Sequence, residues 1–298
     1  MASLIEINQE RKNKIKELKD RTVKRRLQAK GLDEIKEYNV KHTEYHDKEE
    51  YILYDCPIAT GYKGAEEKTK YYIGSDGKEY DTKTDKERSQ ESIKHSQSAS
   101  LKRTKKKIYE YAFANDWSGG WFFTITFDPA QVDSFNYDEC YNRVYQFLKN
   151  VKDSNPDFKY LFVPELHKSG RWHFHGIGVN CDNLKMIDSG IKKNNKQIYN
   201  INQKSYKYGF TTCSQIEDSS KVSYYITKYV TKELINMTKG RHRYLYSKNL
   251  DKPKHETLLD EDYKLTKKLF DVNKNVVSKH VIKNERLGTE TTYLSIKK

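Results

Sequence analysis

Hydrophobic side chains recur at every second position of residues 121–127, which read Trp-Phe-Phe-Thr-Ile-Thr-Phe. One side of an extended chain then carries Phe123, Ile125 and Phe127, and the threonines fall on the other side. Pro129 follows closely and ends the pattern, because proline cannot donate to a strand ladder. The alternation predicts a strand with one face turned toward a core.

Other segments have apolar positions three and four residues apart, or begin at residues typical of helix starts. Helices are expected at 99–116, after Asn136, near 183–191 and at 219–236. Asn136 followed by Glu139 resembles a capping box, and Asp218 or Ser219 caps the last helix. The helix after Asn136 is expected to present an apolar stripe of Tyr141, Val144, Tyr145, Leu148 and Val151.

Three more strands are expected at 159–165, 171–179 and 208–216. The turn residues Lys168-Ser169-Gly170 join the first two as a hairpin. The resulting order is βαββαβα, with neighbouring strands joined as hairpins. This order favours an α+β fold in which helices pack on one face of an antiparallel sheet.

The flanking regions carry different signals. Residues 3–30 show a helical pattern with a dominant basic face, and Tyr-rich residues 36–83 include strand candidates at 50–54 and 71–73, the latter before a hairpin turn. Residues 84–100 are a linker or an exposed helix start, and a late strand is expected at 291–296. The predicted organisation is an N-terminal basic accessory region with a small β extension, a catalytic domain and a C-terminal extension, at residues 1–98, 99–250 and 251–298.

Composition points to nucleic acid as the partner. Lys and Arg total 56 against 42 Asp and Glu, for a net charge of +14 and a pI near 9.3. A solvated basic surface explains that charge about as well, but the 24 Tyr add stacking platforms suited to single-stranded nucleic acid. The scattered cysteines and the lack of a long apolar run predict a soluble cytoplasmic protein without membrane contact. No GxxxxGK[ST] phosphate loop occurs, so a helicase motor is expected to be borrowed.

The 159–179 hairpin carries a candidate metal site. His173 and His175 point to the same face of their strand, and Glu165 precedes them across the turn. Two imidazoles and a carboxylate hold divalent metals and leave positions open for substrate. His167 shares the parity of Glu165 and competes for the third place. The alternative is two exposed strand histidines without a ligand.

The last helix carries candidate nucleophiles. Tyr225 and Tyr229 lie four residues apart, with Lys228 and Lys232 three residues after each. A phenol beside a cation and a metal-activated phosphate can attack phosphorus. Tyr224 competes with Tyr225, but points about 100° away from Tyr229 on a helix. The alternative is that the tyrosines pack against the sheet.

In order and spacing, the strand at 123–127, the residues from Glu165 to His175 and the paired tyrosines resemble the three motifs of HUH endonucleases. The likeness is to two-tyrosine rolling-circle replication initiators of plasmids and single-stranded DNA phages, over residues 100–250. It implies that His173, His175 and Glu165 bind Mg²⁺ or Mn²⁺, and that Tyr225 and Tyr229 are nucleophiles assisted by Lys228 and Lys232. It also implies nicking of single-stranded DNA at an origin, a 5′-phosphotyrosine link, strand rejoining and work beside a host helicase and polymerase in a bacterial cell.

Other functions remain compatible with these residues. A relaxase or a transposase uses the same chemistry, although transposases are usually smaller. A basic regulator that binds DNA without catalysis would use the histidines and tyrosines for packing. An RNA-binding module on a similar sheet is less compatible, because the strand at 123–127 lacks the aromatic and glycine signature of such modules.

Overall fold

The computed structural model describes residues 32–62, 71–73, 79–81, 90–238, 240–261, 264–271, 275–285 and 288–298. The helix predicted at 3–30 lies outside these residues. The chain divides into two compact units, one of residues 1–44, 48–88 and 254–298 and the other of residues 45–47 and 89–253. Among the described helices, none has both the length and the apolar character needed to cross a bilayer.

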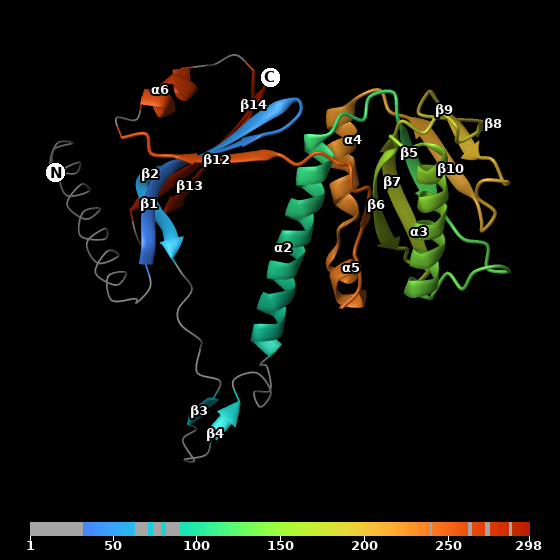
Figure 1. Ribbon diagram of the computed structural model, residues 1–298, viewed down its shortest axis with the longest axis horizontal. Helices are drawn as coiled ribbons and strands as arrows, with labels where there is room; N and C mark the ends of the chain where they lie inside the picture. The colour runs from blue at the N-terminus through green and yellow to red at the C-terminus, as the bar shows by residue number, and fades with distance from the viewer. Residues whose placement is uncertain are drawn as a thin grey trace. The chain divides into compact units, whose positions relative to one another are not determined.

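The first unit is built on a five-stranded antiparallel sheet. Its strand order is β12-β1-β2-β14-β13 (Figure 1), and its strands are β1 (Leu32–Glu44), β2 (Lys48–Tyr62), β12 (Lys254–Leu258), β13 (Val276–Asn284) and β14 (Thr289–Lys297). The strands expected at 50–54 and 291–296 lie in β2 and β14, which pair with each other. The N-terminal and C-terminal parts of the chain therefore share one sheet.

A small core holds helix α6 (Lys264–Asp271) on this sheet. Leu269 of the helix packs with Val40, Leu53 and Leu294 of three neighbouring strands. A separate ladder pairs β3 (Tyr71–Ile73) with β4 (Glu79–Asp81), which confirms the hairpin expected there. The turn between these two strands lies outside the described residues.

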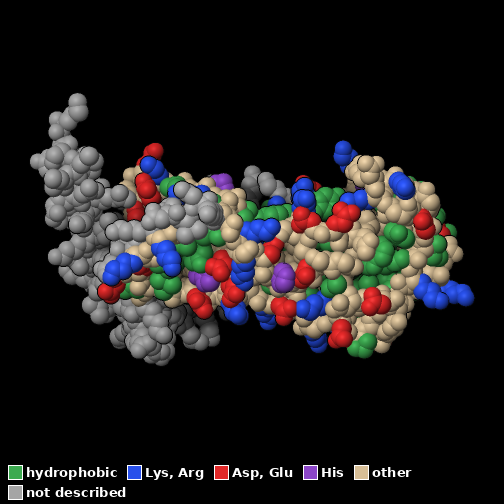
Figure 2. All heavy atoms as spheres, turned by 90° about the horizontal axis from the view of Figure 1, so that it is seen from above, with side chains coloured by type: hydrophobic (Ala, Val, Ile, Leu, Met, Phe, Trp, Pro, Cys, Tyr) green, Lys and Arg blue, Asp and Glu red, His purple; other side chains and the backbone are tan. Residues whose placement is uncertain are grey.

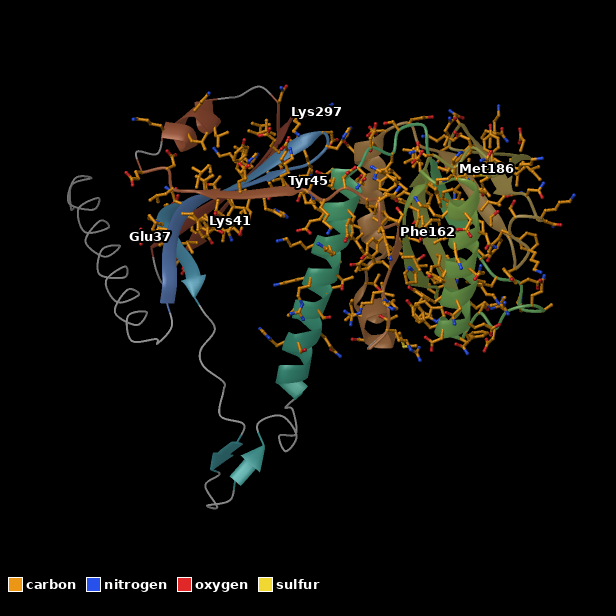
Figure 3. All side chains as sticks on the ribbon, viewed as in Figure 1. Glu37, Lys41, Tyr45, Phe162, Met186 and Lys297 are labelled. Atoms are coloured by element: carbon orange, nitrogen blue, oxygen red, sulfur yellow. The ribbon has the colours of Figure 1, made fainter. Side chains whose placement is uncertain are left out.

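The second unit contains a seven-stranded antiparallel sheet of order β11-β6-β7-β5-β10-β9-β8. Its strands are β5 (Trp121–Ile125), β6 (Lys159–Leu166), β7 (Trp172–Val179), β8 (Met186–Lys193), β9 (Lys196–Ile201), β10 (Thr211–Gln215) and β11 (Leu245–Tyr246). Phe162 lies on β6, and Met186 begins the edge strand β8 (Figure 3). The α+β class with antiparallel sheets is confirmed.

Helices cover both faces of this sheet, so the expectation of helices on one face is wrong. On one face, Trp172 of β7 packs against Tyr137 of α3 (Tyr137–Ser154), with ring centroids 4.7 Å apart. On the other face, His175 of the same strand packs against Tyr229, and α4 (Ser219–Ile226) and α5 (Lys232–Met237) lie on that side (Figure 1). Alternation along β7 sends odd and even side chains into different layers.

Alternation along β5 appears as predicted. Phe123, Ile125 and Phe127 are all buried. Asn136 caps α3 by accepting hydrogen bonds from the backbone N–H groups of Asp138 and Glu139. The predicted stripe on α3 is wrong at Tyr145, which is 50% exposed, because Cys140 and Phe147 fill the positions facing the sheet.

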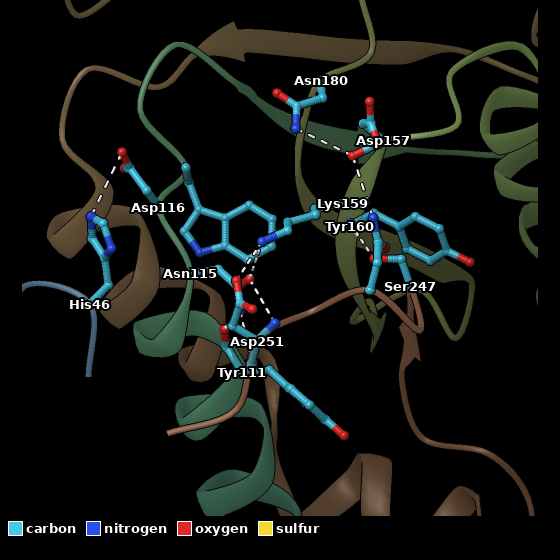
Figure 4. A network of polar contacts seen from close by, with 12 residues as sticks. His46, Tyr111, Asn115, Asp116, Asp157, Lys159, Tyr160, Asn180, Ser247 and Asp251 are labelled. Atoms are coloured by element: carbon cyan, nitrogen blue, oxygen red, sulfur yellow. Dashed lines mark hydrogen bonds and ion pairs between the residues drawn. The ribbon is translucent and has the colours of Figure 1, made fainter. Parts of the chain in front are cut away.

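Helix α2 (Gln90–Ala114) begins earlier than expected, inside the Ser- and Gln-rich stretch considered a linker or a helix start. A polar network ties its end to the sheet (Figure 4). The Nζ of Lys159 on β6 donates to Asn115 Oδ1 at 3.1 Å and to Asp251 Oδ2 at 2.5 Å. Asn115 also accepts from the Asp251 backbone N–H at 3.0 Å. These bonds fix the chain segments that follow α2 and β11.

The helix expected near 183–191 is wrong. Residues 186–193 form β8, which pairs with β9 as an antiparallel hairpin. Asn194 and Asn195 turn the chain with φ values of 51° and 62°, a left-handed pair that asparagine tolerates. The predicted order βαββαβα therefore lacks two strands, and the five strands β6 to β10 follow α3 without an intervening helix.

Candidate functional site

The β6–β7 hairpin brings the predicted ligands onto neighbouring strands. Glu165 is the direct cross-strand partner of His173, and Val163 is the partner of His175. The turn closes through Gly170, whose φ of +82° suits glycine, and the Gly170 N–H donates to the His167 carbonyl at 2.8 Å. The hairpin predicted from sequence is confirmed.

His175 is the most enclosed of these side chains, with 8% of its surface exposed. Its Nε2 lies 2.8 Å from Glu165 Oε2, and its Nδ1 lies 3.1 Å from Thr124 Oγ1 on β5. Burial lowers the pKa of His175 from its usual value, and Glu165 opposes that shift. The ring is therefore neutral at neutral pH, the state in which an imidazole nitrogen can donate a lone pair to a metal.

His173 has a different partner. Its ring stacks on His167, with centroids 5.2 Å apart and planes 14° apart. Burial and the neighbouring His167 lower the pKa of His173. His167 thus lies beside His173 and not beside the contact between Glu165 and His175.

The identity and register of the three predicted ligands fit a divalent metal, since two imidazoles and a carboxylate occupy adjacent positions of two paired strands. Their side chains are not gathered into one cluster. Within the described ranges, no group of three His, Cys, Asp or Glu side chains is close enough to hold a metal ion. Cross-strand Cβ atoms lie about 5 Å apart, so rotation of the His173 and Glu165 side chains is enough to close the set.

The predicted helix 219–236 is broken. Helix α4 ends at Ile226, a 3₁₀ turn η1 covers Thr227–Tyr229, and Val230 is extended with ψ of 91°. Thr231 then starts α5 as its N-cap, with its Oγ1 accepting from the Leu234 N–H at 3.2 Å. The two Tyr-x-x-Lys repeats therefore do not share one continuous helical stripe, because a cap inside the sequence restarts the helix.

Tyr225 and Tyr229 nevertheless lie together. Their ring centroids are 5.4 Å apart and nearly perpendicular. Tyr229 stacks flat on His175, with centroids 3.8 Å apart and planes 11° apart. Burial raises the pKa of the Tyr229 hydroxyl well above its usual value, and the adjacent Tyr225 adds to the rise. Tyr225 keeps 43% of its surface exposed.

The neighbouring candidates separate clearly. Tyr224 turns toward α2, where its ring lies 4.6 Å from Phe113 and 6.3 Å from Tyr109. Lys228 places its Nζ 5.2 Å from the centroid of the Tyr225 ring. Lys232 is the first residue of α5, and its side chain lies outside the described part of the structure.

A cleft of about 930 Å³ contains both tyrosines and His175. Its floor includes Phe122 and Thr124 of β5 and residues 212–215 of β10, and α4 forms one wall. Lys193, Asn194 and Lys196 of the β8–β9 hairpin also line it. These three residues were missed at the sequence level because their segment was assigned to a helix. The consecutive asparagines were the signal for a hairpin turn.

Charge on the molecule as a whole says less than this cleft. Basic and acidic side chains are interspersed over the described atoms on the face shown in Figure 2. The net charge of +14 is therefore not gathered into one patch on that face. The case for a polyanionic ligand rests on lysines next to aromatic and imidazole side chains within the cleft.

Residues 120–234 match a family model, that of the replication-associated protein ORF2. No curated protein and no solved structure shows a significant match to the chain. The matched segment begins at β5, includes the β6–β7 hairpin and the β8–β9 hairpin, and ends in α5. The site and the cleft thus lie in the part of the chain that is similar to replication-associated proteins, and this similarity supports a protein of the replication-initiator type.

Proposed function

We propose that the unit of residues 45–47 and 89–253 nicks single-stranded DNA at a replication origin and keeps the cut strand as a covalent 5′-phosphotyrosine. The observation that carries the proposal is the contact between Tyr229 and His175, 3.8 Å between ring centroids, in a cleft that also holds Tyr225. Nucleophile candidates and ligand candidates come from distant parts of the chain and meet there.

Tyr225 is the first nucleophile in this proposal. It is exposed in the cleft, whereas Tyr229 is half buried and its pKa is raised by that burial. The phenolic oxygen of Tyr225 bonds to phosphorus as the bond from phosphorus to the 3′-oxygen breaks. The phenol proton passes to water in the open cleft, and the departing 3′-oxygen takes a proton from water. The tyrosyl ester conserves the phosphodiester bond, so a 3′-hydroxyl can reclaim it and rejoin the strands.

Glu165, His173 and His175 would hold Mg²⁺ or Mn²⁺, and the lowered pKa of both histidines favours their neutral, metal-binding form. When bound, such a cation supplies positive charge beside the phosphoryl oxygens and makes phosphorus easier to attack. Lys228 adds a charge above the Tyr225 ring and favours its phenolate. The role predicted for Lys232 stays a prediction.

The partners follow from the same reaction. The substrate is the single strand at an origin, and other proteins of the cell, a helicase and a polymerase, unwind and copy the template. The chain contains no GxxxxGK[ST] segment that would bind nucleotide phosphates for unwinding. The printed name of the matched family, a replication-associated protein, agrees with this place in replication.

The test is an SDS-resistant adduct between the protein and labelled single-stranded oligonucleotides from its own replicon, formed with Mn²⁺. We expect Tyr225→Phe to abolish most of the adduct and the double variant Tyr225→Phe, Tyr229→Phe to form none. Tyr224→Phe is the matched control, because Tyr224 packs on α2, and it should form the adduct at the wild-type rate. An adduct that persists in the double variant rejects this site.

A non-catalytic DNA-binding regulator is the second candidate. The observation that favours it is the separation of His173, stacked on His167, from the contact between His175 and Glu165. Such a regulator would bind the oligonucleotide with normal salt dependence and form no adduct with any divalent metal. That outcome would replace the nickase proposal with this one.

A further inference from the structure

We infer that Phe210 is a stacking platform for an unpaired DNA base beside the scissile phosphate. This inference rests on the proposed function and adds a binding residue to it. Phe210 is 80% exposed, more than any other large hydrophobic side chain that the structure describes. Hydration of an exposed phenyl ring is unfavourable, and packing within the unit does not account for this side chain.

The backbone ladder places Phe210 in line with the ligand candidates. The Thr126 N–H donates to the Phe210 carbonyl at 2.9 Å, and the Asp128 N–H donates to the Tyr208 carbonyl at 2.8 Å. These bonds continue the pairing of β5 with β10 past the end of both strands. The register of β5 with β7 pairs Ile125 with Phe174, so Thr126 stands next to His173.

One row across the sheet therefore runs from Glu165 through His173 and Thr126 to Phe210. Phe210 lies two strand spacings from His173, about 10 Å. A nucleotide adjacent to a phosphate held at His173 can span that separation. The position thus fits the base of a neighbouring nucleotide and not the scissile phosphate itself.

Alternation along β10 points the Phe210 ring toward the cleft side of the sheet. Thr212 lines the cleft, whereas Thr211 is buried opposite Ile125. Phe210 has the parity of Thr212 and continues that face. The exposed ring therefore extends the surface on which Tyr225 and His175 lie.

The backbone around Phe210 is fixed although its ring is exposed. The Thr126 hydroxyl donates a second bond to the Phe210 carbonyl at 2.8 Å. Gly209 packs so closely that a Cβ there would lie 2.4 Å from the Thr126 carbonyl oxygen. A ring held on a rigid backbone loses little conformational entropy when a base stacks on it.

The chemistry of this surface selects single-stranded DNA. A base in a duplex is covered on both faces by its neighbours, whereas an unpaired base has a free face for an aromatic ring. Lys193 and Lys196 in the same cleft supply positive charge for the flanking phosphates. Aromatic stacking beside phosphate contacts is the general arrangement of single-strand binding.

The test measures binding without cleavage, by fluorescence anisotropy of a labelled oligothymidylate in EDTA. Stacking on an aromatic side chain contributes about 1–3 kcal/mol per base, so Phe210→Ala should raise Kd about fivefold or more. The slope of log Kd against log salt should stay unchanged, because no cation is removed. Tyr145→Ala is the matched control, an exposed aromatic of α3 on the opposite face, and should bind like wild type.

A second variant reports stacking directly. Trp117 and Trp172 are buried and Trp121 is partly buried, so the indole introduced by Phe210→Trp is the exposed one. We expect its emission to be quenched by single-stranded DNA and not by a blunt duplex. Unchanged affinity of Phe210→Ala together with unquenched emission of Phe210→Trp overturns the inference, and equal quenching by the duplex also overturns it.

These outcomes are separate from those of the nickase test. Stacking in EDTA without any adduct in Mn²⁺ would leave Phe210 as a single-strand binding residue of a non-catalytic protein. A normal adduct with no effect at Phe210 would keep the nickase and remove this residue from its DNA contacts. Thermal unfolding of both variants should match wild type because the side chain is exposed.

Discussion

Two hairpins of the same sheet contribute to the cleft in opposite ways. The β6–β7 hairpin is buried over most of its length and carries Glu165, His173 and His175. The β8–β9 hairpin is largely exposed at β8 and carries Lys193 and Lys196. Catalytic groups need fixed positions, which a buried hairpin provides, whereas phosphate contacts tolerate a solvated one. We therefore expect the first hairpin to govern chemistry and the second to govern affinity.

The largest expected effect separates chemistry from binding on the buried hairpin. His175→Ala and His173→Ala should each lower the rate of adduct formation about a hundredfold or more, because a metal ligand is lost. Affinity for the oligonucleotide in EDTA should change little, since both imidazoles are neutral at neutral pH. The two measurements are the SDS-resistant adduct with Mn²⁺ and fluorescence anisotropy without metal. A parallel fall of both would mark a folding defect and contradict the ligand assignment.

The next effect compares one glycine from each hairpin. A Cβ at Gly176 of β7 would lie 2.3 Å from the Phe162 ring, which covers the strand there. Gly176→Ala should lower the free energy of unfolding by about 1–3 kcal/mol through overpacking. Gly190 of β8 has φ of +70° and open space around its Cβ position, so Gly190→Ala should cost about 1 kcal/mol from backbone strain alone. Urea unfolding measures both, and a larger loss at Gly190 would reverse the comparison.

The smallest effect belongs to the exposed hairpin. Lys193→Ala and Lys196→Ala should each weaken single-strand binding a few-fold and lower the salt slope by about 0.7, one phosphate contact each. Lys196 now pairs with Glu217 at 2.8 Å, and a phosphate would replace that partner. Lys149→Ala on α3, an exposed lysine away from the cleft, is the control. An unchanged salt slope in both hairpin variants would remove these lysines from the DNA path.

The same contrast explains which parts of the fold were predictable from sequence. Strands β5, β6 and β7 are buried, so their apolar side chains follow a regular spacing that identifies them. Strand β8 is mostly exposed and its residues carry no such spacing, which led to the wrong helix near 183–191. Only the turn residues Asn194 and Asn195 marked the hairpin.

The break in the segment after β10 was hidden for a different reason. Residues 219–236 have enough helix-compatible residues to read as one helix, but Thr231 satisfies the first N–H groups of a new helix better than it continues the old one. A threonine two residues before Glu233 was the available signal. Which way a long segment resolves such a choice depends on packing, here of Tyr229 on His175.

For the candidate site, sequence predicted neighbourhood and not side-chain direction. Parity and the hairpin turn suffice to place Glu165 beside His173, which the register confirms. The partner of each imidazole depends on residues from elsewhere, such as Thr124 for His175 and His167 for His173. Such contacts follow from tertiary packing and have no spacing signature. The two-tyrosine metal site therefore remains a proposal for experiment.

The most direct test of the central claim locates the DNA on the protein. After reaction of the full chain with an origin oligonucleotide and Mn²⁺, proteolysis and mass spectrometry should find the nucleotide mass on Tyr225, with Tyr229 as the alternative acceptor, and EDTA should prevent it. Attachment to Tyr224 or to a residue outside the cleft, or cleavage that leaves no DNA on the protein, would contradict the account.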